Sequence, residues 1–202
     1  MISAYRIEPA RLVACSIDNA HILLASEATD ADKDYLLRET GLEPADLESI
    51  ADPDEVPRVE NTRDGVFVIW KQPDNVSCGD TIQFEVSSLG IVVAPDRAFF
   101  IVPRGEMPHT GREFRRVQSV ADYVLGVLLH TIHHYQGHLK VIKMMSQELQ
   151  AKVVTAMENR YLLQMFALGE SLVYYHNALE ANLAVLGKLR FGLSKLSSKI
   201  RR

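Results

Sequence analysis

The chain has 202 residues, of which 47% are hydrophobic and 24% are charged, and its formal net charge is −4. These values are ordinary for a soluble globular protein of one or two domains, and the charge alone names no partner. No stretch of 18 uncharged apolar residues occurs and no apolar segment follows Met1, so we expect neither a membrane span nor a signal peptide. Cys15 and Cys78 are too few for a metal motif or a disulfide framework, and a reducing compartment is expected.

All eight prolines lie within the first 108 residues. Because proline interrupts helices, the proline-free remainder is expected to be helical. The sequence therefore predicts a lobe over residues 1–118 and a long helical extension over residues 119–202. Acidic residues predominate in the first region and basic residues in the second. These opposite charges either favour docking, within one chain or between copies, or simply form solvated faces.

The lobe begins with two predicted strands, over residues 12–17 and 21–24. A short helix is expected after Thr29, with Asp32 completing its capping pair and Gly41 ending it. Pro44 suits the first turn of a second helix. Further strands are predicted at residues 58–60, 66–70, 81–86, 91–94 and 98–102, with turns at residues 63–65 and 95–97.

The second region reads as two long helices. Ser119 and Asp122 form a capping pair, and a turn is expected near Glu158 and Asn159. Apolar residues at three- and four-residue spacing predict the contact seam of each helix. The first seam is Leu128, Ile132, Tyr135, Leu139, Ile142, Leu149 and Val153, and the second is Leu162, Met165, Gly169, Leu172, His176, Leu179, Leu183, Leu186, Leu193 and Ile200. The predicted class is α/β (α+β): a mixed or antiparallel sheet with flanking helices, followed by long antiparallel α-helices.

Motifs for catalysis are missing from the sequence. It contains no phosphate-binding glycine pair, no Gly-x-Ser-x-Gly and no His-Glu-x-x-His, so we expect no enzyme activity and no required cofactor. Basic residues crowd the C-terminal end, from Lys188 to Arg202. An apolar seam runs among them, and cations are favoured at a helix C-terminus in any case, so no nucleic-acid partner is predicted.

Four of the seven histidines fall within nine residues, at positions 130, 133, 134 and 138. Steps of four residues drift by only about 40° around a helix, so His130, His134 and His138 share one face, which we place opposite the first seam. Imidazoles four residues apart can chelate Zn²⁺, Ni²⁺ or Co²⁺. The alternative is that these histidines only pack against another helix.

An ordered set of segments resembles the cytoplasmic domain of CorA-type magnesium and divalent-cation transporters, the CorA/ZntB superfamily. The segments cover most of residues 35–195. They are Gly41–Pro44, Leu47–Ile50, Pro57–Glu60, Gly65–Lys71, Phe84–Gly90 and Ala121–Leu125. The resemblance implies a cation-sensing lobe at the cytoplasmic face of the cell membrane, followed by long helices and assembled as a homopentamer. The family's later stalk helix, membrane spans and Gly-Met-Asn signature are not found in the chain, so we expect an excised domain or a shortened paralogue.

Two departures from the family bear on the metal. The family's sensing aspartate falls at Ser49, which leaves Glu48 and Asp52 as the carboxylate ligands for a hard cation such as Mg²⁺. His130 and His134 stand where the family usually has aspartates, which admits a softer ion such as Co²⁺ or Zn²⁺. The predicted metal residues are therefore Glu48, Asp52, His130, His134 and His138. The leading hypothesis is a cation-sensing regulatory domain of a CorA-like transporter, and the alternative is a non-transporting helical module for interaction or oligomerisation.

Overall fold

The computed structural model describes residues 1–9, 11–62, 65–74, 77–78, 82–105, 111–156 and 158–200. Its strands are β1 (Ile2–Glu8), β2 (Arg11–Ala14), β3 (Ile22–Ser26), β4 (Arg58–Asn61), β5 (Val66–Pro73), β6 (Ser77–Cys78), β7 (Ile82–Gln83), β8 (Val86–Val93) and β9 (Ala98–Val102). Its helices are α1 (Asp30–Thr40), α2 (Pro44–Ala51), α3 (Val120–Ala156) and α4 (Asn159–Ile200), with 3-10 turns η1 (Ile17–Asn19) and η2 (Arg112–Phe114).

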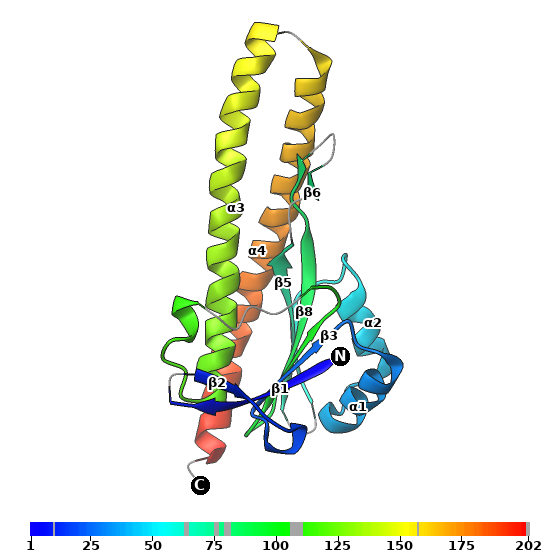
Figure 1. Cartoon of the computed structure of the whole chain (residues 1–202), viewed down its shortest axis with the longest axis vertical. Coiled ribbons are helices and arrows are strands. Elements are labelled where there is room, and N and C mark those ends of the chain that lie inside the picture. The colour runs from blue at the N-terminus through cyan, green and yellow to red at the C-terminus, as the bar shows by residue number, and fades with distance from the viewer. Residues whose placement is uncertain are drawn as a thin grey trace.

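A seven-stranded sheet forms the lobe, in the order β2-β1-β3-β9-β8-β5-β4 (Figure 1). Strands β3 and β9 pair in parallel and all the other pairs in this sheet are antiparallel, so the predicted mixed sheet is confirmed. Strands β6 and β7 form a separate two-stranded ladder. The prediction of one strand over residues 81–86 is wrong, because β7 ends at Gln83 and β8 begins at Val86. The predicted turn residues Arg63 and Asp64 lie outside the described residues.

Helix α1 begins and ends at the predicted residues, and α2 begins at the predicted Pro44. Thr29 accepts a hydrogen bond from the backbone of Asp32 while the Asp32 carboxylate accepts one from the Thr29 backbone, a reciprocal capping box. Gly41 ends α1 in the left-handed region, at φ 68°. Pro44 occupies the first turn of α2, whose N-terminus is capped by Glu43 and Asp46.

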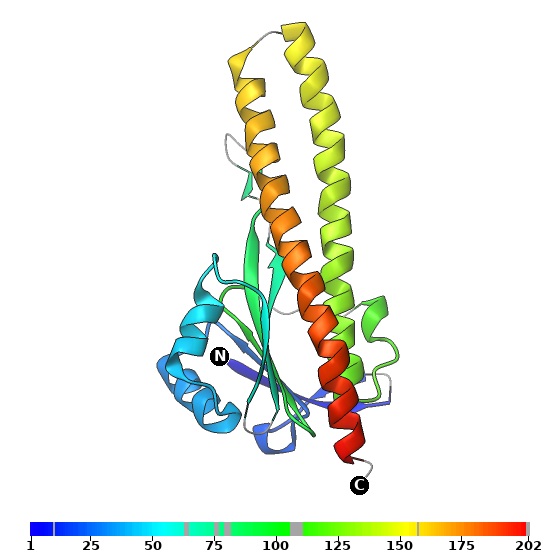
Figure 2. The ribbon, with the colours of Figure 1, turned by 180° about the vertical axis from the view of Figure 1, so that it is seen from behind.

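Both faces of the sheet are covered, which makes three layers (Figure 2). One face packs against α1 and α2 through a core that includes Leu36, Ile50, Phe67 and Phe99. The other packs against the start of α3 and the end of α4. The buried residues at this second face include Trp70, Phe100, Tyr123, Leu128 and Val185. Because β5 is covered on both sides, its residues 66–70 form a continuous apolar run rather than an alternating one.

Helices α3 and α4 form the predicted antiparallel hairpin, and its tip lies far from the sheet (Figure 1). The predicted seam of α3 is confirmed, because Leu128, Tyr135, Ile142 and Leu149 are all buried. None of the described helices combines the length and the apolarity that crossing a bilayer requires.

The predicted seam of α4 is confirmed only in part: Met165, Leu179 and Leu186 are partly buried against the core, but the fully buried row lies one residue, about 100°, away around the helix. Leu162, Leu172 and Leu183 are exposed, whereas the buried row is Leu168, Ser171, Tyr175, Ala178, Asn182, Val185 and Leu189. Two polar residues, Ser171 and Asn182, lie in this row because each bonds the backbone of the lobe. The predicted seam positions Leu193 and Ile200 have side chains outside the described part of the chain.

Candidate functional site

The five predicted metal residues fall into two groups on different elements. Glu48 and Asp52 lie on α2 and at its C-cap, on the face of the sheet that α1 and α2 cover. The three histidines lie on α3, which covers the opposite face. The structure therefore presents two separate regions. Across the described residues, no group of three or more His, Cys, Asp or Glu side chains is arranged to hold a metal ion.

The carboxylate region lies at the end of α2. Glu48 and Asp52 are both exposed. The Oδ1 atom of Asp52 accepts a hydrogen bond of 2.9 Å from the backbone of Asp54, which folds the chain back after the helix. Ser88 on β8 donates a bond of 3.2 Å to the Asp52 carbonyl. The helix end is thus tied to the sheet, and its exposed carboxylates face solvent, where a hard cation could reach them.

Beneath these carboxylates lies the buried side chain of Lys71, which is 4% exposed. Its Nζ atom donates to the Pro53 carbonyl and to Ser88 Oγ, the latter at 2.8 Å. Burial lowers the pKa of Lys71, although nearby carboxylates, Asp52 first among them, oppose that shift. The Lys71 side chain therefore joins β5 to the segment that follows α2, and sequence reasoning missed it.

The backbone of Lys71 makes a second connection, to α4. Strand β4 pairs with β5 only as far as Ile69, so the edge of β5 has no strand partner at Lys71. Asn182 takes that place: its Oδ1 accepts from the Lys71 N–H at 3.0 Å, and its Nδ2 donates to the Lys71 carbonyl at 2.7 Å. One residue, Lys71, thus links the end of α2 to α4 through a single strand.

The histidine row on α3 divides into two pairs. His130 and His133 approach Glu113 of η2: His133 Nδ1 lies 2.7 Å from Oε1, and His130 Nδ1 lies 3.8 Å from Oε2. The Glu113 side chain is 6% exposed. Its own backbone N–H, together with His133, Arg112 and His130, lowers its pKa to about 2. This cluster fastens η2 to α3, so one of the predicted ligands, His130, already faces a carboxylate.

The second pair, His134 and His138, lies one turn further along α3. Their ring centroids are 4.4 Å apart, and His138 Nδ1 lies 2.6 Å from the Tyr175 hydroxyl on α4. Phe84 contacts the other side of His138, with ring centroids 5.4 Å apart. Burial lowers the pKa of both histidines; His130 adds to the shift of His134, which Asp74 opposes, and His134 adds to the shift of His138. The predicted position of the row opposite the seam is wrong for His138, which lies at the contact between the two helices.

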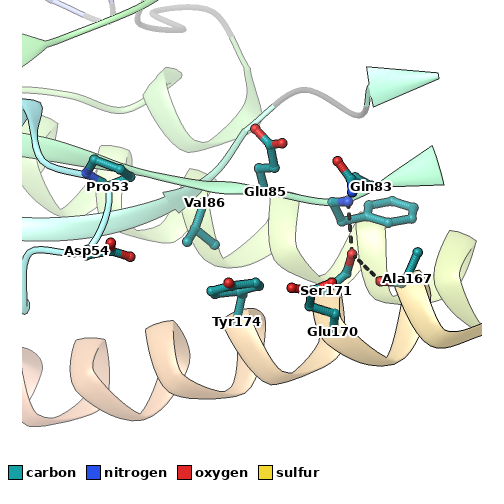
Figure 3. Close-up of a pocket in the computed structure, with 10 residues that line it drawn as sticks. Pro53, Asp54, Gln83, Glu85, Val86, Ala167, Glu170, Ser171 and Tyr174 are labelled. Atoms are coloured by element: carbon teal, nitrogen blue, oxygen red, sulfur yellow. Dashed lines mark hydrogen bonds between the residues drawn. The ribbon is translucent and has the colours of Figure 1, made fainter. Parts of the chain in front are cut away.

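A pocket of about 370 Å³ opens between α4 and the chain that leads into β8 (Figure 3). Asp54, Glu85 and Glu170 give it an acidic rim, and Tyr174 and Val86 supply apolar surface. Ser171 fixes one wall by accepting a bond of 3.1 Å from the Phe84 backbone and donating to Ala167 (Figure 3). Glu85 points away from Tyr174 and Ser171, so Asp54 and Glu170 are the carboxylates on the side of the tyrosine (Figure 3). The negative charge of this rim favours cations at the pocket.

The contacts of Glu113 with His130, His133 and Arg112 predict how the stability of the protein depends on pH in the acid range. A carboxyl group whose pKa is depressed by folding stabilises the protein above its unfolded pKa, and this contribution is lost as the pH falls towards the folded value. Glu113→Gln should therefore lower the free energy of unfolding at pH 7 by about 1–2 kcal/mol. Between about pH 5 and pH 2, the free energy of unfolding of this variant should decrease less steeply with falling pH than that of wild type. Urea unfolding across this pH range measures both effects, with Glu180→Gln on the exposed face of α4 as the control. An unchanged acid slope in Glu113→Gln would contradict the assignment.

A mixed seven-stranded sheet, covered on one face by short helices and on the other by a long helical hairpin, is the fold of CorA-type cytoplasmic domains, and the predicted resemblance is confirmed at the level of the fold. No protein-family model matches the sequence. No curated protein matches it either. The likeness is to solved structures at 22% identity or less, and it concerns the fold alone.

Three of these structures define the comparison. The soluble domain of CorA from Methanocaldococcus jannaschii is 22% identical with a TM-score of 0.71, over 92% of this chain and 77% of that one. The complete CorA magnesium transporter of the same organism is 20% identical with a TM-score of 0.71, over 93% of this chain and 61% of the transporter. The ZntB cytoplasmic domain from Vibrio parahaemolyticus RIMD 2210633 is 11% identical with a TM-score of 0.69, over 98% of this chain and 82% of that domain.

Proposed function

We propose that this chain is the cation-sensing cytoplasmic domain of a CorA-like divalent-cation transporter. The observation that carries the proposal is that its topology, long hairpin included, follows the soluble domain of CorA over 92% of this chain. One of the neighbours is a complete magnesium transporter, which supports a role in cation transport rather than in catalysis. In this proposal the domain works at the cytoplasmic face of a membrane as one copy of a homopentamer.

The proposed sensing region is the end of α2, with Glu48 and Asp52 as carboxylate ligands for Mg²⁺. Lys71 connects this region to α4, since its side chain donates a hydrogen bond to the Pro53 carbonyl and its backbone is hydrogen-bonded to Asn182. The Lys71 ammonium already compensates part of the negative charge nearby. We therefore expect binding in the millimolar rather than the micromolar range.

A titration with Mg²⁺ tests the proposal. An ion that binds only the folded state at ten times its Kd adds about 1.4 kcal/mol to the free energy of unfolding. We expect a stabilisation of that size in wild type and its loss in the variant Glu48→Gln/Asp52→Asn, measured by urea unfolding at fixed ionic strength. Asp34→Asn on the exposed face of α1 is the matched control. Equal responses of the variant and the wild type would contradict the assignment of these ligands.

The alternative, a helical interaction module, has one observation in its favour. The outer face of α4 exposes large apolar side chains, including Phe166 at 74% and Leu183 at 69% exposure. Isolated apolar residues are common on protein surfaces, but several on one helix are typical of a contact face. Sedimentation of the same samples with and without divalent cations distinguishes the two functions: self-association that is the same in both, together with no stabilisation by Mg²⁺, would favour the module.

A further inference from the structure

The pair His134 and His138 differs from the other histidines in how it is held. His138 is fixed on three sides, by the Tyr175 hydroxyl at 2.6 Å, by the Phe84 ring and by His134. The Tyr175 ring lies nearly parallel to the His138 ring, with an interplanar angle of 15° and ring centroids 6.1 Å apart. Because the bond to Tyr175 engages Nδ1, the Nε2 atom is the ring nitrogen left for another ligand. Histidines that bind metals usually have this arrangement, with the second nitrogen bonded to an orienting group.

His134 lies four residues before His138, on the same face of α3, and both are half-buried. Side chains four residues apart on a helix have Cβ atoms only about 5–6 Å apart, which is close enough for two imidazoles to reach one ion. Their rings already touch. The negative charge of Asp74, the residue after β5, acts on both His134 and Tyr175. Asp74 thus offsets part of the burial that lowers the pKa of His134, and the neutral imidazoles that burial favours are the form that binds a metal ion.

We propose that His134 and His138 form a two-nitrogen chelate for a borderline transition-metal ion, with Zn²⁺, Co²⁺ and Ni²⁺ as the class of ligand and water completing the coordination. The proposal adds a second ion site to the proposed cation-sensing domain. Its role in sensing rests on that proposed function, whereas the binding of the ion does not. It departs from the three-histidine site predicted from the sequence, because His130 instead approaches Glu113 and lies next to the Phe114 ring, with ring centroids 6.0 Å apart.

The choice of ion follows from the ligands. Imidazole nitrogen suits Zn²⁺, Co²⁺ and Ni²⁺, whereas Mg²⁺ prefers oxygen and keeps its water. This second region would therefore respond to different ions from the carboxylates of α2. Through Tyr175, an ion on α3 would also strengthen the contact between the two helices of the hairpin. The chelate would then stiffen the hairpin next to Ser171, where α4 bonds the lobe.

The test uses the untagged chain and Ni²⁺ and Zn²⁺ in isothermal titration calorimetry. We expect one ion per chain in wild type, and a loss of affinity of at least tenfold in His134→Gln and in His138→Gln. Tyr175→Phe, which keeps the ring and removes the orienting hydroxyl, should weaken binding by roughly tenfold, as other orienting partners do. His133→Gln is the matched control, because His133 lies in the same turn of α3 and faces Glu113; its affinity should stay within about twofold of wild type.

Each outcome decides the proposal. Affinity in His134→Gln or His138→Gln equal to wild type would overturn it, as would an absence of Ni²⁺ and Zn²⁺ binding in wild type. Far-UV circular dichroism verifies that each variant is folded. If a histidine variant is unfolded, Tyr175→Phe still tests the proposal, because it retains both histidine ligands. Mg²⁺ stabilisation should be unchanged in His134→Gln. In wild type, Ni²⁺ binding without any stabilisation by Mg²⁺ would reject the function of the α2 region and leave the chelate standing.

Discussion

Replacing Asn182 by alanine should lower the free energy of unfolding by about 2–4 kcal/mol, although the change removes only one small side chain. Asn182 is 2% exposed and pairs with both backbone groups of Lys71. Alanine would leave a buried N–H and a buried carbonyl without partners, and each such group costs about 1–3 kcal/mol. The loss should exceed that of an ordinary hydrogen bond, because strand β4 does not reach this part of β5.

Urea unfolding measures this effect, and Asn177→Ala is the matched control. Asn177 lies on the same helix but is exposed, so its replacement should change the free energy of unfolding by less than about 0.5 kcal/mol. Proteolysis at the end of α4 should also become faster in Asn182→Ala, because the helix loses its polar connection to the sheet. If Asn182→Ala and Asn177→Ala had equal free energies of unfolding, packing alone would account for the attachment of α4 to the sheet.

Gly90→Ala should destabilise the lobe by about 1–3 kcal/mol through overpacking. Gly90 lies in β8 under α2, and a Cβ added there would lie 2.3 Å from Ile50 Cδ1 and 2.8 Å from Ile50 Cγ1. The close approach of α2 to the sheet, and hence the position of Glu48 and Asp52, depends on this missing side chain. The new methyl group would force α2 outwards or Ile50 out of its rotamer.

A double-mutant cycle with Ile50→Ala checks this origin. Ile50→Ala alone should cost about 2–5 kcal/mol because it leaves a cavity. In that background the added methyl group fills space, so Gly90→Ala should become neutral or stabilising, with a coupling energy of at least about 1 kcal/mol. Gly187→Ala on α4, where nothing lies within 4 Å of the new Cβ, is the control and should be slightly stabilising. Additive effects of the two lobe substitutions would refute the steric explanation.

The parts of the fold that the sequence predicts are those governed by local chemistry. Thr29, Asp32 and Gly41 determine where α1 begins and ends through bonds within a few residues. Strand β1 was missed for the opposite reason. Its seven residues include no fully buried side chain, so it lacks a strong alternating pattern and is fixed instead by its neighbours β2 and β3.

Long-range pairing explains the other misses. Lys71 and Asn182 are 111 residues apart, and no spacing rule connects a strand lysine to a helix asparagine. The seam of α4 was placed on its more apolar stripe, but the buried row contains Ser171 and Asn182 because the lobe offers them backbone partners. The histidine cluster was visible in the sequence. That His133 contacts Glu113 while His138 contacts Tyr175 was not, because these partners come from η2 and α4.

The most direct measurement of the central claim is amide hydrogen exchange in the Mg²⁺ titration proposed above, because it reports separately on the lobe and on the helices. If cation binding at the end of α2 is transmitted through Lys71, saturating Mg²⁺ should slow exchange by at least tenfold both at residues 50–55 and in α4 around Asn182. Glu48→Gln/Asp52→Asn should abolish both effects. Exchange in α4 that is identical with and without Mg²⁺, despite protection at the end of α2, would contradict transmission to the helices.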